Sequence, residues 1–232
     1  METFRYLTST EAPAAVGPYS LGLVPNKPGQ ERTYTFESSN PDIATATAEI
    51  LEQIKKQIDL SRVAMVKVGL PDISGYPAMN AKYAEVFSDH KPARLALAPE
   101  QGDLTMQVIV WDDTNAGDES DSVPVYLSGQ VGLNPKSERP ALVEGGLEAE
   151  MRQTIQNIRA ALLAAELGLA SVHTLQVYIP KSVNRADAEA ALNEAWGDQT
   201  PTVEWEVVNQ LPLSAQVEIV AKANKPIGQK LD

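Results

Sequence analysis

The residues of this chain that could do chemistry exclude several mechanisms at once. There is no cysteine, which excludes disulfides, thiol nucleophiles and zinc sites built on cysteine. The two histidines, His90 and His173, cannot form a three-histidine metal site. Any catalysis must therefore use other groups, and we expect neither a bound metal nor a cofactor.

The charge balance limits the partners. Lys and Arg number 19 and Asp and Glu 31, a formal net charge of −12, which repels a phosphate backbone and disfavours a nucleic-acid partner. No apolar run is long enough for a membrane span. The first residues show neither a secretory signal nor an Arg-rich transit pattern, so we expect a cytoplasmic protein and leave a mitochondrial location open.

An internal repeat organises the 232 residues. The strand-like segment 63–71 is matched by 172–180, which lies 109 positions later (172 − 63 = 109). Pro201 follows Pro92 at the same spacing. A constant spacing between matching apolar and proline positions indicates two copies of one unit.

Both copies predict the same order of elements. An amphipathic helix precedes the repeated strand, a second helix follows it, and a further strand closes the unit. We therefore expect an α+β fold with two tandem halves, each a mixed sheet with two helices on one face. The expected helices cover 43–58, 76–87, 151–162 and 185–196, and the closing strands cover 104–111 and 215–223.

An acidic segment without periodicity separates the copies. We predict a linker over 113–122, which leaves a first domain over 1–112 and a second over 123–232. The strand expected near 106–111 is almost uniformly apolar, and such strands seldom face water. We therefore expect a homo-oligomer.

Four segments resemble motifs of a known family. They are Ala12–Ser20 (APAAVGPYS), Tyr126–Gln130 (YLSGQ), His90–Arg94 (HKPAR) and Val217–Ile219 (VEI). Together they resemble the Rid/YjgF-like family of reactive-imine deaminases, which is also known as the L-PSP endoribonucleases. The resemblance implies two chorismate-mutase-like halves, assembly into trimers, and ligand clefts between neighbouring subunits.

The resemblance also implies roles for particular residues. Arg94 would hold a substrate carboxylate, because the planar guanidinium matches two carboxylate oxygens and stays charged. Glu218 would lie near the attacking water and pass on its proton. The expected substrate-binding residues are Tyr19, Ser128 and Gly129, together with Asn80 on the second helix.

The two copies depart from the family pattern in different places. The first copy has 35–40 (TFESSN) where Ser-Gly-Gln should stand, and Gln107 where the glutamate should stand. The second copy lacks the Gly-Pro-Tyr-Ser segment and has Val203 at the position equivalent to Arg94. Each copy therefore holds only part of the set.

A composite site would combine the two parts. In this hypothesis Tyr19 or Arg94 of the first copy meets Ser128 or Glu218 of the second, while the reciprocal cleft is inactive. Such a site would hydrolyse 2-imino acids or their enamine tautomers, for example 2-iminopropanoate and 2-iminobutanoate, to 2-oxo acids and ammonia.

Two other functions stay open at this point. The eroded motifs favour a catalytically inactive module that binds a small molecule or serves as an accessory domain. RNA cleavage is attached to the family by name, but the acidic balance and the lack of an aromatic and basic stripe weigh against it.

Overall fold

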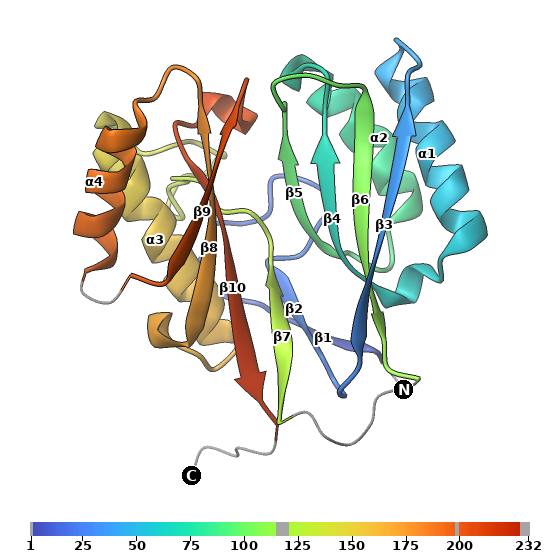
Figure 1. Ribbon diagram of the computed structural model, residues 1–232, viewed down its shortest axis with the longest axis horizontal. Helices are drawn as coiled ribbons and strands as arrows, with labels where there is room; N and C mark the ends of the chain where they lie inside the picture. Colours follow the sequence, from blue (N-terminus) through green and yellow to red (C-terminus); the bar gives the residue numbers. More distant parts are fainter. Residues whose placement is uncertain (1, 115–120, 198–199, 228–232) are drawn as a thin grey trace.

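Two sheets lie face to face at the centre of the molecule, and helices cover the outer side of each (Figure 1). The computed structural model describes residues 2–114, 121–197 and 200–227. This arrangement confirms the expected α+β class with two halves. Within the described ranges, no helix is both long and apolar enough to cross a membrane.

The first half is a four-stranded mixed sheet. Its elements are β3 (Gln30–Ser38), α1 (Ile43–Gln57), β4 (Val63–Gly69), α2 (Tyr76–Val86), β5 (Ala93–Leu97) and β6 (Leu104–Asp112). The strand order is β3-β6-β4-β5, with β4 parallel to β5. Asp42 begins α1 by accepting a hydrogen bond from the Thr45 amide, and the apolar residues Ala46, Ile50 and Ile54 turn one face of this helix to the core.

The second half forms most of a six-stranded mixed sheet. Its elements are β7 (Ser122–Leu127), α3 (Gly146–Ala164), β8 (Val172–Pro180), α4 (Arg185–Trp196), β9 (Thr202–Val208) and β10 (Glu218–Pro226). Two short strands from the start of the chain, β1 (Phe4–Tyr6) and β2 (Gly22–Pro25), complete the order β1-β2-β7-β10-β8-β9. All four expected helices are confirmed, and α4 has the predicted bounds.

The first strands of the chain do not stay with the first half. β2 pairs antiparallel with β7 through Gly22 opposite Leu127, and β1 pairs with β2. This pairing covers an edge of β7 that would otherwise be open. The boundaries 1–112, 113–122 and 123–232 stay a prediction, and residues 115–120 of the expected linker lie outside the described residues.

The strand register repeats at the spacing that the sequence predicts. Val66 lies opposite Arg94 in the parallel pair β4 and β5, and Leu175 lies opposite Val203 in the parallel pair β8 and β9. The strand register also shifts at the matching place in each half. The shift lies between Val63 and Met65 where β4 pairs with β6, and between Lys222 and Ala223 where β10 pairs with β8. The repeat therefore extends to details of hydrogen bonding.

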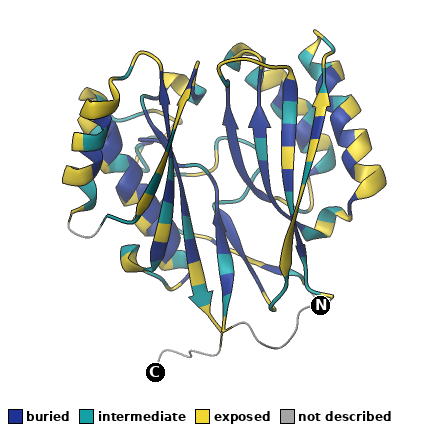
Figure 2. Ribbon diagram, viewed as in Figure 1, coloured by how far each residue is buried: buried dark blue, intermediate teal, exposed yellow. Residues whose placement is uncertain are grey.

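The apolar strand β6 is buried inside the chain. Met106, Val108 and Val110 pack with α1 and α2 in one core cluster, and Trp111 belongs to the other. The central strands are largely buried, while exposed residues lie on the outer helix surfaces, in the loops and along β3 and β9 (Figure 2). Because β6 is buried within its own chain, its apolar residues give no reason to expect a homo-oligomer, and the oligomeric state stays a prediction.

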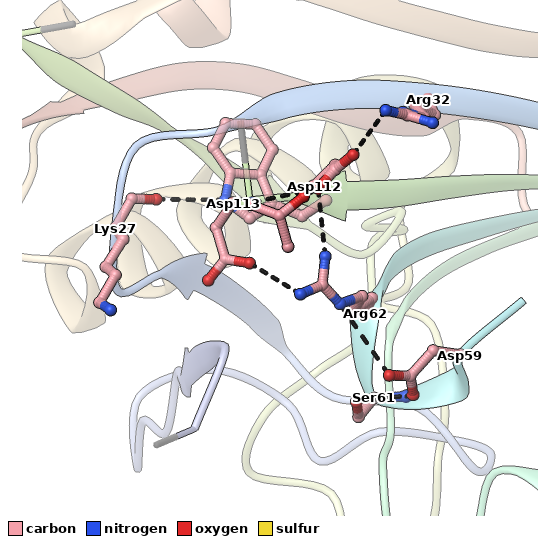
Figure 3. Close-up of polar contacts among 9 residues, drawn as sticks. Lys27, Arg32, Asp59, Ser61, Arg62, Asp112 and Asp113 are labelled. Carbon is pink, nitrogen blue, oxygen red and sulfur yellow. Dashed lines mark hydrogen bonds and ion pairs between the residues drawn. The ribbon is translucent and has the colours of Figure 1, made fainter. Parts of the chain in front are cut away.

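A cluster of charges fixes the end of the first half. Arg62 lies between Asp112 and Asp113, with guanidinium nitrogens 3.2 and 3.1 Å from their carboxylate oxygens (Figure 3). Arg32 of β3 reaches the other oxygen of Asp112 at 2.6 Å. These pairs hold the last residues of β6 against the start of β4, just before the chain passes into the predicted linker.

His90 fastens the first strand to the other sheet. Its Nε2 donates to the Val63 carbonyl at 2.6 Å, its Nδ1 accepts the Tyr6 hydroxyl, and its ring stacks on Phe4 with centroids 5.8 Å apart. Burial lowers the pKa of His90. The histidine therefore joins the two halves as a neutral ring.

Acidification should loosen this contact. Below the ordinary histidine pKa of about 6.5, His90 binds a proton in the unfolded chain but not yet in the folded protein. The free energy of unfolding therefore decreases as the pH is lowered. We expect the His90→Phe variant, which keeps a ring against Phe4, to be less stable at neutral pH but to lose less on acidification. Urea unfolding on both sides of about pH 6.5 measures this, and equal slopes for the two proteins would contradict it.

Candidate active site between the two halves

A cavity of about 320 Å³ lies where the two halves meet. Its walls come from the segment before β2, the start of α2, strand β5, the loop after β7 and the start of β10. Arg94 of the first half and Glu218 of the second both line it, as do Tyr19 and Gly129. The structure therefore brings together residues that lie far apart in the sequence, in the combination that the composite hypothesis requires.

The backbone at Arg94 forms hydrogen bonds to the second half. Its amide donates to the Ser128 hydroxyl at 2.9 Å, and its carbonyl accepts from the Gly129 amide at 2.9 Å. The Ser128 hydroxyl in turn donates to the Ser20 carbonyl at 2.6 Å. Ser128 is fully buried and is not among the described residues that line the cavity, so the structure places it as a support for Arg94.

The guanidinium of Arg94 is surrounded by aromatic rings and neutral acceptors. Its terminal nitrogens donate to the Asn80 side-chain oxygen and the Tyr76 hydroxyl, both at 2.7 Å. Its central carbon lies 4.5 Å from the Tyr19 ring centre and 5.0 Å from that of Tyr83. Among the described residues Arg94 forms no ion pair with an acid, and a guanidinium has five N–H donors. Donors therefore remain for an anionic ligand.

Helix α2 supplies the supports of this arginine. Tyr76, Asn80 and Tyr83 follow one another at the spacing of a single helix face. Asn80 orients Arg94 and is not among the described cavity-lining residues, so a direct ligand contact by Asn80 stays a prediction. Tyr76 lines the cavity and was missed by the sequence analysis, although its position one turn before Asn80 could have indicated it.

Glu218 presents an unusual carboxyl group to the same cavity. The residue is only 5% exposed, and its Oε2 atom has no hydrogen-bond partner in the described part of the chain. Burial raises the pKa of Glu218 to about 8, and the charges of Arg94 and Lys67 oppose this only partly. At neutral pH the carboxyl group therefore carries a proton that it can give and take back.

Gly129 makes room for that carboxyl group. A Cβ atom at this position would lie 2.2 Å from Glu218 Oε1 and 2.9 Å from Leu95 Cδ1. The glycine of the Ser-Gly-Gln segment therefore lets the Glu218 carboxyl group approach closely, and any side chain here would displace that group.

Tyr19 covers the guanidinium from the segment before β2. Its hydroxyl accepts a hydrogen bond from the Val16 amide at 3.1 Å, and burial raises its pKa to about 12. Gly17 allows this segment to pass close by, since a Cβ there would lie 2.7 Å from the terminal nitrogen of Arg94. The Gly-Pro-Tyr-Ser segment thus closes one side of the cavity over Arg94.

The reciprocal position in the repeat lacks both the guanidinium and the carboxyl group. Val203 occupies the register position of Arg94, as the spacing predicts. Glu218 lies opposite Tyr178, and the matching residue Gly69 lies opposite Thr105. The assignment of Gln107 as the glutamate counterpart is therefore wrong, because strand register and not the similarity of three letters sets the position. With valine and threonine, the second position has neither a carboxylate anchor nor an acid.

Comparison with known proteins identifies relatives for part of the chain. The family model described as endoribonuclease L-PSP matches residues 121–225. A RutC family protein of Pyrococcus abyssi is 32% identical over 123 residues, which cover 44% of this chain and 93% of that protein. A RutC family protein of Pyrococcus horikoshii is 30% identical over 101 residues, which cover 44% of this chain and 79% of that protein.

One solved structure resembles nearly the whole chain. A chorismatase crystal structure matches 91% of this chain and 80% of its own, with a TM-score of 0.62 and 12% sequence identity. At this identity the likeness concerns the fold alone. It shows that two such halves occur side by side in another protein.

Proposed function

This chain belongs to the Rid/YjgF (RutC, endoribonuclease L-PSP) family, and from that premise we propose that it hydrolyses reactive 2-imino acids to 2-oxo acids and ammonia. The family supports a small-molecule-binding or deaminase-like role in general terms. The observation that carries the finer proposal is the single cavity that both the Arg94 guanidinium and the buried Glu218 carboxyl group line.

The binding step follows from the free donors of Arg94. A 2-imino acid carries a carboxylate next to its C=N bond, and two parallel N–H donors of the guanidinium match the two carboxylate oxygens. Tyr76 and Asn80 hold the guanidinium plane, so little freedom is lost on binding. The imine carbon is thereby placed beside Glu218.

The chemical step follows from the raised pKa of Glu218. The protonated carboxyl group gives its proton to the imine nitrogen, and a water molecule adds to the carbon. The resulting carboxylate takes a proton from the adding water and passes it to the nitrogen of the tetrahedral adduct. It then takes the hydroxyl proton as the adduct collapses, the C–N bond breaks, and ammonia leaves with the 2-oxo acid as product. A group with a pKa near the working pH can give and accept protons in these steps, and imines need little more than positioning and proton transfer.

A trapping assay tests this proposal. Threonine dehydratase supplies 2-iminobutanoate, and semicarbazide captures the imine that survives. We expect the wild-type protein to lower the trapped imine and the Gly129→Ala variant to be at least tenfold less active, because its Cβ displaces the Glu218 carboxyl group, and displacements of about 1 Å can cost about 10² in rate.

Gly168→Ala is the matched control. A Cβ at Gly168 meets nothing within 4 Å, so full activity is expected. Equal trapping with and without wild-type protein would refute the deaminase and favour a binding module. An RNA degradation assay on the same samples tests nuclease activity, which the net charge of −12 disfavours.

A further inference from the structure

The cavity has a polar floor and apolar walls. Arg94 and Glu218 are 3% and 5% exposed, so the guanidinium and the carboxyl group lie at its buried end. Most of the other lining residues are apolar, and they include Val16, Leu21, Ile73, Val131 and Leu133. A ligand whose carboxylate reaches Arg94 must therefore extend the rest of its structure along apolar surface.

A strained turn forms part of the outer wall. In the short helical turn Pro212–Ser214 (η4), Leu213 and Ser214 have φ values of 60° and 58°. Non-glycine residues rarely adopt this left-handed conformation, and pairs of them are rarer still. Leu213 lines the cavity and yet is 47% exposed, which places its side chain at the mouth.

The surrounding structure holds this turn in place. The Ala215 amide closes it by donating to the Pro212 carbonyl at 3.1 Å. The next residue, Gln216, donates from its backbone and its side chain to the carboxylate of Glu150, a buried residue of α3, at 2.8 and 3.1 Å. Strain that is fixed in this way at the rim of a site indicates a function for the strained residue.

We propose that Leu213 and the apolar walls form a side-chain subsite that selects 2-imino acids with leucine-sized apolar side chains over the alanine-derived imine. This inference rests on the proposed function. The cavity of about 320 Å³ falls in the range of small-molecule sites, roughly 300–1,000 Å³, and a three-carbon acid would fill only its floor. Each further methylene buried against these walls favours binding by about fourfold.

Imines of different size test the subsite. An L-amino acid oxidase with dioxygen and catalase produces 2-imino acids from leucine and from alanine, and semicarbazide traps what survives. For the wild type we expect kcat/KM to be at least about tenfold higher for the leucine-derived imine, allowing for incomplete burial of its three additional carbons.

The substitution Leu213→Asn isolates the side chain from the strain. Asparagine tolerates the left-handed conformation, so the turn is kept while the apolar surface is lost. We expect the leucine-to-alanine selectivity ratio to fall about tenfold. The matched control is Leu163→Asn on α3, which is 62% exposed and does not line the cavity, and its ratio should equal that of the wild type.

Binding of the products separates this inference from the proposed function. Calorimetric titration with 4-methyl-2-oxopentanoate and with pyruvate measures the subsite without catalysis. If no imine is hydrolysed but the larger acid binds at least tenfold more tightly through Leu213, the subsite stands and the deaminase fails. If imines are hydrolysed with equal kcat/KM, or if Leu213→Asn leaves the ratio unchanged, the subsite is refuted and the deaminase stands.

Discussion

Replacing Arg94 with alanine is expected to lower kcat/KM for 2-iminobutanoate by about 10²–10⁴. The substrate loses a bidentate contact, and each hydrogen bond to a charged group contributes about 1.5–3 kcal/mol. Both the ground state and the transition state carry the carboxylate, so much of the loss should appear in KM. Initial rates over a range of imine concentrations measure the two parameters.

Two further variants separate charge from structure. Arg94→Lys keeps the charge but cannot form the fork or bond both Asn80 and Tyr76 in the same plane, so we expect an intermediate loss. Arg152→Ala removes an exposed arginine that pairs with Glu194, neither of which is among the described residues that line the cavity, and its kinetics should equal those of the wild type. Wild-type kinetics in a folded Arg94→Ala variant, as judged by thermal unfolding, would show that Arg94 does not bind the carboxylate.

Replacing Glu218 with glutamine is expected to lower kcat by about 10²–10⁴, the usual contribution of a general acid or base. Glutamine has the same shape but cannot transfer a proton. In the wild type, kcat/KM should decline as the pH rises through about 8, because the carboxyl group of the free protein then loses the proton that it donates. The variant should have no such decline.

The same substitution should change how stability depends on pH. The pKa of Glu218 is about 8 in the folded protein and 4.5 in its ordinary state, so the unfolded chain releases a proton that the folded chain retains. The stability of the wild type should therefore fall as the pH rises from 4.5 to about 8 and then level off. The free energy of unfolding should decrease by at most about 5 kcal/mol over this interval, at about 1.36 kcal/mol for each pKa unit.

Urea unfolding across this interval measures the effect. We expect Glu218→Gln to lack this part of the slope and to exceed the wild type in stability above about pH 8. The control Glu204→Gln changes a carboxylate that is 54% exposed on β9, and it should follow the wild type. Parallel curves for wild type and Glu218→Gln would mean that the carboxyl group is ionised in the folded protein.

Local patterns in the sequence were sufficient to predict most of the helices and the repeated strands. Apolar residues at helical spacing placed α1, α2 and α4 to within a few residues, because a helix buries one face whatever it packs against. The constant spacing of the repeat made Val203 the equivalent of Arg94 in the second copy, since both copies fold with the same strand register. The motif segments then singled out Tyr19, Gly129 and Glu218, which line one cavity.

The tertiary structure alone decided which atoms meet. β1 and β2 join the sheet of the other half, Thr105 rather than Gln107 takes the place of Glu218, and the Ser128 hydroxyl is used to hold Arg94. Strand register and contacts between the two halves depend on how distant segments pair, and this pairing cannot be predicted from residues that are neighbours in the sequence. The orphaned carboxyl oxygen of Glu218 and the left-handed turn at Leu213 likewise arise only once burial and packing are complete.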